Sequence, residues 1–352
     1  MISRSHSSIA LTAGLAASSP RPPAQSGLIV VDHLLGLETA DDGCLHRLGK
    51  GEQFGLRPCA SNAGKPGVKA MDECDPPIMV GTDFPYRDFY PKSARTIQID
   101  WEPTRIGRRH PVDIGLVAHA GPTLAALTER VAKRESGSFL EAIQAEMARW
   151  RESRDKDEAS DSVPIAPPRV LKAVSDAAPD DTIFIADTGT ATAWAARHLR
   201  IRSGQRFTLS GGLATMAIGL PGAIGAQLAY PQRRVVAIVG DGAFSMLVGD
   251  LVTAVRYELP VVIVVLNNAK LGFITLEQEA KGLPDWGTDI SNPDFTALAE
   301  ACGALGISVT DPSELSAALA AGLRRPQACG RQCQRRSGRL DHAAEDRTIP
   351  RR

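Results

Sequence analysis

Runs of apolar residues alternate with amphipathic stretches through the second half of the chain, a pattern that predicts strands alternating with helices. The stretches 235–239 (VVAIV) and 260–266 (PVVIVVL) contain no charged residue and are typical of strands buried on both faces. Further strands are expected at 182–186 and 306–309, and helices near 168–178, 191–199, 213–228, 244–257, 272–280 and 294–302. This order predicts an α/β fold with a doubly wound parallel sheet.

The first half of the chain shows a weaker version of the same pattern. Strands are expected at 77–81 and 96–100, followed by helices at 121–134 and 139–154. They indicate a smaller α/β domain that is incomplete at its front. Before it, residues 1–69 are rich in Gly, Ser, Pro and Ala, and only 27–35 keeps a regular period, so we expect this segment to pack poorly.

These changes in pattern divide the chain into parts of different character. The charged run RESRDKDEASDS at 151–162 indicates a connector or a frayed helix end between the two domains. We therefore expect an irregular segment at 1–69, an incomplete central domain at 70–150, a linker at 151–163, the larger α/β domain at 164–323 and a basic disordered tail at 324–352.

Composition excludes several classes of protein. The 352 residues carry 40 basic and 40 acidic side chains, so no whole-chain positive field exists to attract nucleic acid, and no apolar run is long enough for a transmembrane segment. The six cysteines are scattered without paired spacing, which favours reduced thiols in a cytoplasmic protein.

Both ends of the chain leave a less favoured alternative open. The segment 9–17 weakly resembles a secretory signal, which would change the expected location. Residues 324–352 hold nine arginines against three acids, and an arm that binds RNA or lipid is the alternative to a disordered tail. No aromatic residue lies among these arginines, so we expect no nucleic-acid partner.

Candidate chemistry begins where the strand 235–239 runs into Gly240-Asp241-Gly242. The glycines lack Cβ atoms where a phosphate could approach the backbone, and a divalent cation would reconcile that phosphate with Asp241. Asn268 follows the next strand, so both side chains are expected at the same edge of the sheet. The Asp241 carboxylate, the Asn268 amide oxygen and a nearby backbone carbonyl suit Mg²⁺. A lone GDG, in contrast, is typical of a simple tight turn.

The complete pattern of strand, GDG, helix, apolar strand and NN resembles the cofactor motif of the thiamine diphosphate (thiamine pyrophosphate, TPP) enzymes, the acetolactate synthase and pyruvate oxidase superfamily. The similarity continues through 240–279 and 288–309 and is closest to the branch of pyruvate oxidase and quinone-dependent pyruvate dehydrogenase. The resemblance implies that Mg²⁺ is held by Asp241, Asn268 and the carbonyl of Lys270. It also implies diphosphate contacts from Gly240, Gly242, Ala243, Leu271 and Gly272.

The resemblance assigns further roles around the cofactor. Met216, preceded by Thr215, matches the bulky residue that supports the bent cofactor, although a helix-core methionine is the alternative. Phe273 and Glu277 match residues of the substrate pocket, and the loop 187–190 (DTGT) matches one that approaches the cofactor. The implied substrate is a 2-oxo acid such as pyruvate.

The smaller domain resembles the FAD-binding central domain of the pyruvate oxidase branch. Its flavin contacts would come from Thr82, Asp83, Phe84, Pro85, Tyr86 and Asp100. Without the resemblance, the aromatic residues of this loop would indicate ordinary packing. The family's small Gly-Leu loop against the flavin is replaced by Pro58-Cys-Ala-Ser-Asn62, which leaves FAD binding open.

The resemblance covers roughly residues 68–323 and does not include the family's first domain, which supplies the glutamate that activates the cofactor. We therefore expect a catalytically incomplete protein, and the abrupt loss of similarity at both ends suggests altered reading frames or a truncated gene. An alternative is one subunit of a split enzyme, as an oligomer or with a partner that carries the pyrimidine-binding domain. A doubly wound nucleotide-binding protein without thiamine is the third alternative.

Overall fold

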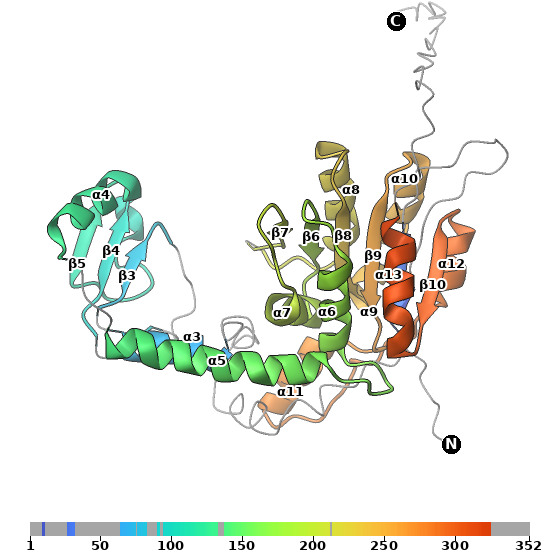
Figure 1. The fold of residues 1–352 in the computed structure, drawn as a ribbon, viewed down its shortest axis with the longest axis horizontal. Helices are drawn as coiled ribbons and strands as arrows, with labels where there is room; N and C mark the ends of the chain where they lie inside the picture. The colour runs from blue at the N-terminus through green and yellow to red at the C-terminus, as the bar shows by residue number, and fades with distance from the viewer. Residues whose placement is uncertain are drawn as a thin grey trace, which may run out of the picture.

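The computed structural model describes residues 64–74, 76–82, 90–91, 94–132, 137–211 and 213–324, and the backbone of two short strands at 9–10 and 27–31. Its described strands form three groups. A small parallel sheet lies at one end of the long helix α5 (Ser138–Glu158), and a larger, four-stranded parallel sheet with an adjoining three-stranded one lies at the other (Figure 1). This confirms the predicted α/β class. No helix among the described residues combines the length and apolarity that a membrane crossing requires.

The larger sheet contains the two fully apolar strands that the sequence predicts. Four parallel strands lie in the order β7 (Arg206–Thr208), β6 (Ile183–Ala186), β8 (Val235–Gly240) and β9 (Val261–Leu266). The side chains of 235–239 and 261–265 are at most 1% exposed, as expected for strands covered on both faces. Gly240 is paired with Leu266, so β8 and β9 end at the same level.

Helices accompany this sheet, and two of them differ in extent from the sequence-based prediction. The helices are α6 (Pro167–Ala177), α7 (Thr190–His198), α8 (Gly219–Ala229), α9 (Asp241–Met246), α10 (Asp250–Arg256), α11 (Gly272–Ala280), α12 (Phe295–Ala301) and α13 (Leu315–Leu323). Helix α13 lies where the sequence predicts no element. The helix predicted at 213–228 begins only at Gly219, because the preceding residues form a turn. The helix predicted at 244–257 is interrupted before Asp250, where Gly249 weakens helix formation.

Two strands from the beginning of the chain join strand β10 (Leu305–Val309). The strand β2 (Gly27–Val31) pairs with β10 in parallel and contacts β9, while β1 (Ile9–Ala10) pairs antiparallel with β10. Strand β2 falls within 27–35, where the sequence keeps a regular period. Strand β1 lies where we expected no regular element, so that expectation is wrong for these two residues.

The small sheet is parallel, in the order β3 (Ile78–Val80), β4 (Ile97–Asp100) and β5 (Ile114–Val117). Strands β3 and β4 confirm the predicted ones, whereas β5 lies where the pattern predicts no element. The accompanying helices are α3 (Gly64–Glu73), the 3-10 turn η4 (Pro103–Arg105) and α4 (Ala120–Arg130). Helix α3 contacts α5 and begins inside the segment that we expected to be irregular.

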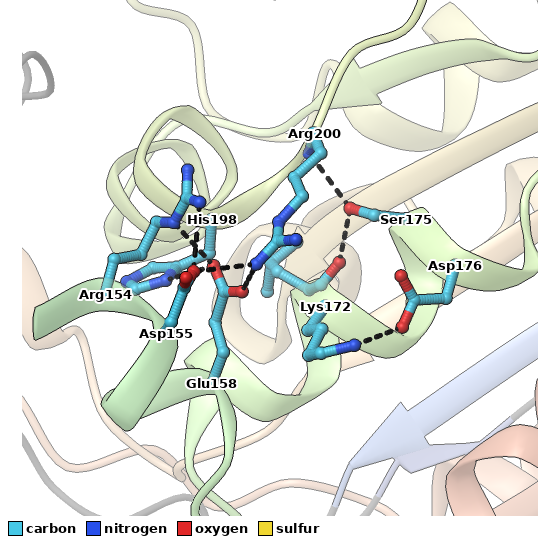
Figure 2. Close-up of polar contacts among 9 residues, drawn as sticks. Arg154, Asp155, Glu158, Lys172, Ser175, Asp176, His198 and Arg200 are labelled. Atoms are coloured by element: carbon cyan, nitrogen blue, oxygen red, sulfur yellow. Dashed lines mark hydrogen bonds and ion pairs between the residues drawn. The ribbon is translucent and has the colours of Figure 1, made fainter. Parts of the chain in front are cut away.

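The end of α5 is attached to the larger domain through the buried carboxylate of Glu158 (Figure 2). Glu158 lies 3.2 Å from Nε of Arg154 and 3.3 Å from Nδ1 of His198, and it also pairs with Arg200. Burial, with repulsion from Arg197, Arg154 and Arg200, lowers the pKa of His198 to about 3. The imidazole is therefore neutral near pH 7. Much of the expected linker at 151–163 is consequently the last turns of a helix fixed to the larger domain.

Candidate functional site

The first residue of the candidate site is Asp241, which directly follows β8 and begins α9. It is 2% exposed, and this burial raises the pKa of its carboxyl, while hydrogen bonds from Asn292 and from the amides of Gly242 and Ala269 oppose the rise. A cation bound beside the carboxylate would favour its charged form further. The structure thus holds a buried, hydrogen-bonded acid at the carboxyl end of a parallel strand.

Asn267 and Asn268 follow β9 at the same edge of the sheet. Oδ1 of Asn267 accepts a hydrogen bond from the amide of Ala269 at 3.2 Å, and Oδ1 of Asn268 accepts one from the amide of Lys270 at 3.1 Å. These are two successive Asx turns, in which Ala269 adopts φ +53°. Because an amide oxygen has two lone pairs, Asn268 keeps one for a cation.

Lys270, whose backbone carbonyl is the expected third ligand of the cation, is held by contacts of both its side chain and its backbone. Its side chain pairs with Asp285 and lies 3.3 Å from Oδ1 of Asp289, and its backbone forms an isolated antiparallel bridge with Asp289. The next amide, of Leu271, donates to the carbonyl of Thr288 at 2.8 Å. The segment that would supply the carbonyl is therefore held in place by residues of a later loop.

Gly242 lies in close contact with the loop that would carry the diphosphate. A Cβ atom at this position would come within 2.9 Å of the Ile290 side chain and 3.0 Å of the Leu271 side chain, so Gly242 lies close to both. Ala243 is buried, and Gly272 is the first residue of α11, where backbone amides are free to bind an anion. The expected diphosphate contacts Gly240, Gly242, Ala243, Leu271 and Gly272 thus come from two neighbouring segments.

Met216 lies in a turn before α8, which excludes the alternative that it belongs to a helix core. The backbone on either side takes positive φ, +48° at Ala214 and +69° at Ala217. The buried carboxylate of Asp187 accepts from the amides of Ala217 and Gly219, both at 2.8 Å. Met216 is half-buried and Thr215 is exposed. The loop 187–190 therefore shapes this turn directly.

Phe273 and Glu277, the expected substrate-pocket residues, are both half-buried on α11. They are four residues apart and therefore lie on the same face of the helix. Helix α11 begins immediately after Leu271, so it adjoins the loop of the expected metal ligands.

The expected flavin contacts are only partly described. Asp83, Phe84, Pro85 and Tyr86 lie outside the described residues, and Thr82 is exposed after β3. Asp100 ends β4 and is 2% exposed; its Oδ1 accepts from the amide of Glu102 at 2.9 Å, while its Oδ2 is buried without a partner among the described residues.

The structure adds one residue that the sequence analysis missed. Nδ2 of Asn292 donates to Oδ2 of Asp241 at 2.7 Å and to Oδ1 of Asn267 at 2.8 Å. Asn292 lies in the sequence NPDF before α12, a typical helix start that gives no indication of chemistry. Its role depends on a contact across 51 residues of sequence, which no local pattern encodes.

The donor set fits a hard divalent cation at this edge. The protein offers three ligands: one buried carboxylate, one amide oxygen with a free lone pair and one backbone carbonyl. This leaves room for ligand phosphates and water, as Mg²⁺ prefers. No group of three His, Cys, Asp or Glu side chains suited to a metal occurs elsewhere in the described part of the chain. The arrangement suits a cation shared with a phosphorylated ligand better than a cage of carboxylates.

Two family models match the chain. The C-terminal TPP binding domain of thiamine pyrophosphate enzymes matches residues 187–329, and the central domain of the same enzymes matches residues 27–127. The first match contains the whole candidate site. The second begins at residue 27 and therefore includes strand β2 (Gly27–Val31). In the structure, this strand pairs with β10 and does not belong to the small sheet.

Curated relatives point to the same family. "Putative thiamine pyrophosphate-containing protein YdaP" of Bacillus subtilis is 45% identical over 75% of this chain and 46% of that protein. Pyruvate oxidase of Lactiplantibacillus plantarum is 37% identical over 68% of this chain and 40% of the enzyme. The acetolactate synthase large subunit of Parasynechococcus marenigrum is 36% identical over 73% of this chain and 43% of that subunit. The chain thus spans less than half the length of each of these relatives.

Proposed function

Because the chain belongs to the thiamine pyrophosphate enzyme family through its central and C-terminal domains, we propose that it binds thiamine pyrophosphate together with Mg²⁺ where β8 and β9 end. The observation that carries the proposal is the pairing of Gly240 with Leu266. This register brings Asp241 and the two asparagines after β9 to one edge of the sheet, where open α/β sheets bind ligands.

In this proposal, each group of residues has a distinct task. Asp241, Asn268 and the carbonyl of Lys270 hold the cation, and the amides near Gly242 and Gly272 receive the diphosphate. Met216, on its rigid turn, supports the organic part of the ligand. When bound, the cofactor supplies an electron sink for the decarboxylation of a 2-oxo acid.

The similarity to family members also suggests a class of substrate. Pyruvate oxidase is among the relatives, and we propose that a 2-oxo acid such as pyruvate is positioned by Phe273 and Glu277. These side chains share one face of α11, so they can contact the same small molecule. We propose further that turnover requires a pyrimidine-binding domain from another polypeptide, and that the protein acts in the cytoplasm. The need for a pyrimidine-binding domain can be tested by mixing the chain with such a domain from a relative. Pyruvate consumption should then appear only in the mixture.

FAD is a second candidate ligand, at the smaller sheet. The buried, unpartnered Oδ2 of Asp100 at the end of β4 is the observation that favours it, since a ligand hydroxyl could donate to this oxygen. Bound FAD would give a yellow protein with quenched flavin fluorescence, and Asp100→Ala would weaken that binding. Equal binding to wild type and Asp100→Ala would contradict the assignment.

A thermal melt tests the main proposal. We expect thiamine pyrophosphate and Mg²⁺ together to raise the melting temperature, and we expect either alone to have little effect, because the cation would offset the repulsion between the Asp241 carboxylate and the diphosphate. Asp241→Ala should abolish the rise. Asp161→Ala is a matched control, since its side chain is 79% exposed. An equal rise in Asp241→Ala and wild type would contradict the proposed metal site.

A further inference from the structure

We propose that Asn292 is a positioning residue for the cation site, which it serves by orienting Asp241 and by reserving Asn268, rather than Asn267, as the amide ligand. The inference rests on the proposed function and adds a residue from the segment before α12 to that site. Its basis is the contact of one side-chain amide with the ends of both central strands.

Asn292 fixes the orientation of Asp241. Its amide nitrogen carries two hydrogens and donates to two acceptors, Oδ2 of Asp241 at 2.7 Å and Oδ1 of Asn267 at 2.8 Å. This bond holds Oδ2 of Asp241 and so fixes the rotation of the carboxylate that would face the cation. A ligand carboxylate held by an outer hydrogen bond is a common way of setting the geometry of a metal site.

The same amide distinguishes the two neighbouring asparagines. Oδ1 of Asn267 accepts from Asn292 and from the amide of Ala269, so both of its lone pairs are engaged. Within the described part of the chain, Oδ1 of Asn268 accepts only from the amide of Lys270. Asn267 is therefore a structural residue, while Asn268 can still coordinate a cation.

Asn292 is itself held from both sides. Before it, the amide of Ile290 donates to the carbonyl of Ala269 at 2.8 Å. After it, Asp294 caps α12 by accepting from the amides of Thr296 and Ala297 at 2.9 and 3.0 Å. Oδ1 of Asn292 is buried and has no partner among the described residues, a feature typical of a site that is completed by water or a ligand.

Asp294 allows a structural role of Asn292 to be separated from a positioning role. If Asn292 only anchors the start of α12, its loss should resemble the loss of the α12 cap. Asp294→Ala removes that cap and leaves the contacts of Asn292 with Asp241 and Asn267 in place, so it is the matched control.

The experiment is a titration of thiamine pyrophosphate into the full chain at a series of Mg²⁺ concentrations, followed by calorimetry. We expect Asn292→Ala to raise the Mg²⁺ concentration at half-saturation by about tenfold or more. Asp294→Ala should lower the melting temperature without changing the Mg²⁺ requirement. If Asn292→Ala does not fold, Asn292→Ser serves instead, because its shorter hydroxyl cannot reach both acceptors and should raise the requirement similarly.

The outcomes separate this inference from the proposed function. A wild-type chain that binds the cofactor with Mg²⁺, together with an unchanged Mg²⁺ requirement in Asn292→Ala or Asn292→Ser, overturns the role of Asn292 alone. An equal shift in Asp294→Ala would likewise reduce Asn292 to a helix anchor. A wild-type chain that shows no Mg²⁺-dependent binding overturns the proposed function and this inference together.

Discussion

The carboxylate of Asp187, at the end of β6, accepts a hydrogen bond from the amide of Gly219 at 2.8 Å, across 32 residues of sequence. The same carboxylate accepts from the amides of Thr188 and Ala217, also at 2.8 Å. One buried acid thus fixes the loop after β6, the turn that carries Met216 and the start of α8.

Asp187→Ala should destabilise the fold strongly. The substitution removes the acceptor for the amides of Thr188, Ala217 and Gly219, and hydrogen bonds to charged groups contribute roughly 1.5–3 kcal/mol each, with incomplete additivity. We expect the free energy of unfolding, measured with urea, to fall by about 3 kcal/mol or more. Asp187→Asn keeps one acceptor oxygen, so its free energy of unfolding should lie between those of the wild type and Asp187→Ala. A loss below about 1 kcal/mol in Asp187→Ala would show that these bonds contribute little.

Gly219→Ala and Gly225→Ala should change stability in opposite directions. Both residues belong to α8, but a Cβ at Gly219 would lie 2.2 Å from Val239 and 2.8 Å from Asp187, whereas nothing lies within 4 Å of one at Gly225. Gly219→Ala should cost about 1–3 kcal/mol through overpacking. Gly225→Ala should stabilise by about 0.5–1 kcal/mol, because alanine favours the helix. Equal effects in urea unfolding would contradict the described packing between α8 and β8.

His198 should make stability depend on pH below neutrality. Its pKa is lowered to about 3 in the folded chain from an ordinary value of 6.5, and it faces Glu158 as well as Arg154, Arg197 and Arg200. Between these pH values the imidazole is protonated in the unfolded chain and neutral in the folded one. The stabilisation that neutral His198 provides is therefore complete above pH 6.5 and is lost as pH falls toward 3.

The expected slope of this loss is up to about 1.4 kcal/mol per pH unit. His198→Gln should lack that component when unfolding is followed from pH 7.5 to 4.5. The comparison with wild type isolates His198 from Glu158 and Asp187, whose pKa values burial raises. Parallel pH profiles for the two proteins would contradict a pKa of His198 that folding lowers.

The elements that the sequence could predict are those encoded locally. Apolar runs without interruption identified β8 and β9, and the GDG and NN motifs placed Asp241 and Asn268 after them, because chain order and strand direction suffice for that inference. The parallel pairing that ends at Gly240 and Leu266 agrees with this expectation.

The parts that the sequence could not predict depend on contacts between distant segments. Nothing around Asn292 indicates a bond to Asp241, and a polar residue before a helix is typical of an ordinary cap. The delayed start of α8 likewise depends on Asp187, which satisfies amides of the preceding turn from another loop. The pairing of β2 with β10 joins segments near the two ends of the described chain, since Gly27 pairs with Leu305.

The most direct test of the account is a crystal structure of the chain with thiamine pyrophosphate and Mn²⁺, which prefers the same oxygen ligands as Mg²⁺ and gives an anomalous signal. We predict one strong anomalous peak within about 2.3 Å of the Asp241 carboxylate, Oδ1 of Asn268 and the carbonyl of Lys270, with diphosphate oxygens completing the coordination. A peak bound elsewhere, or cofactor density without a metal at Asp241, would contradict the account.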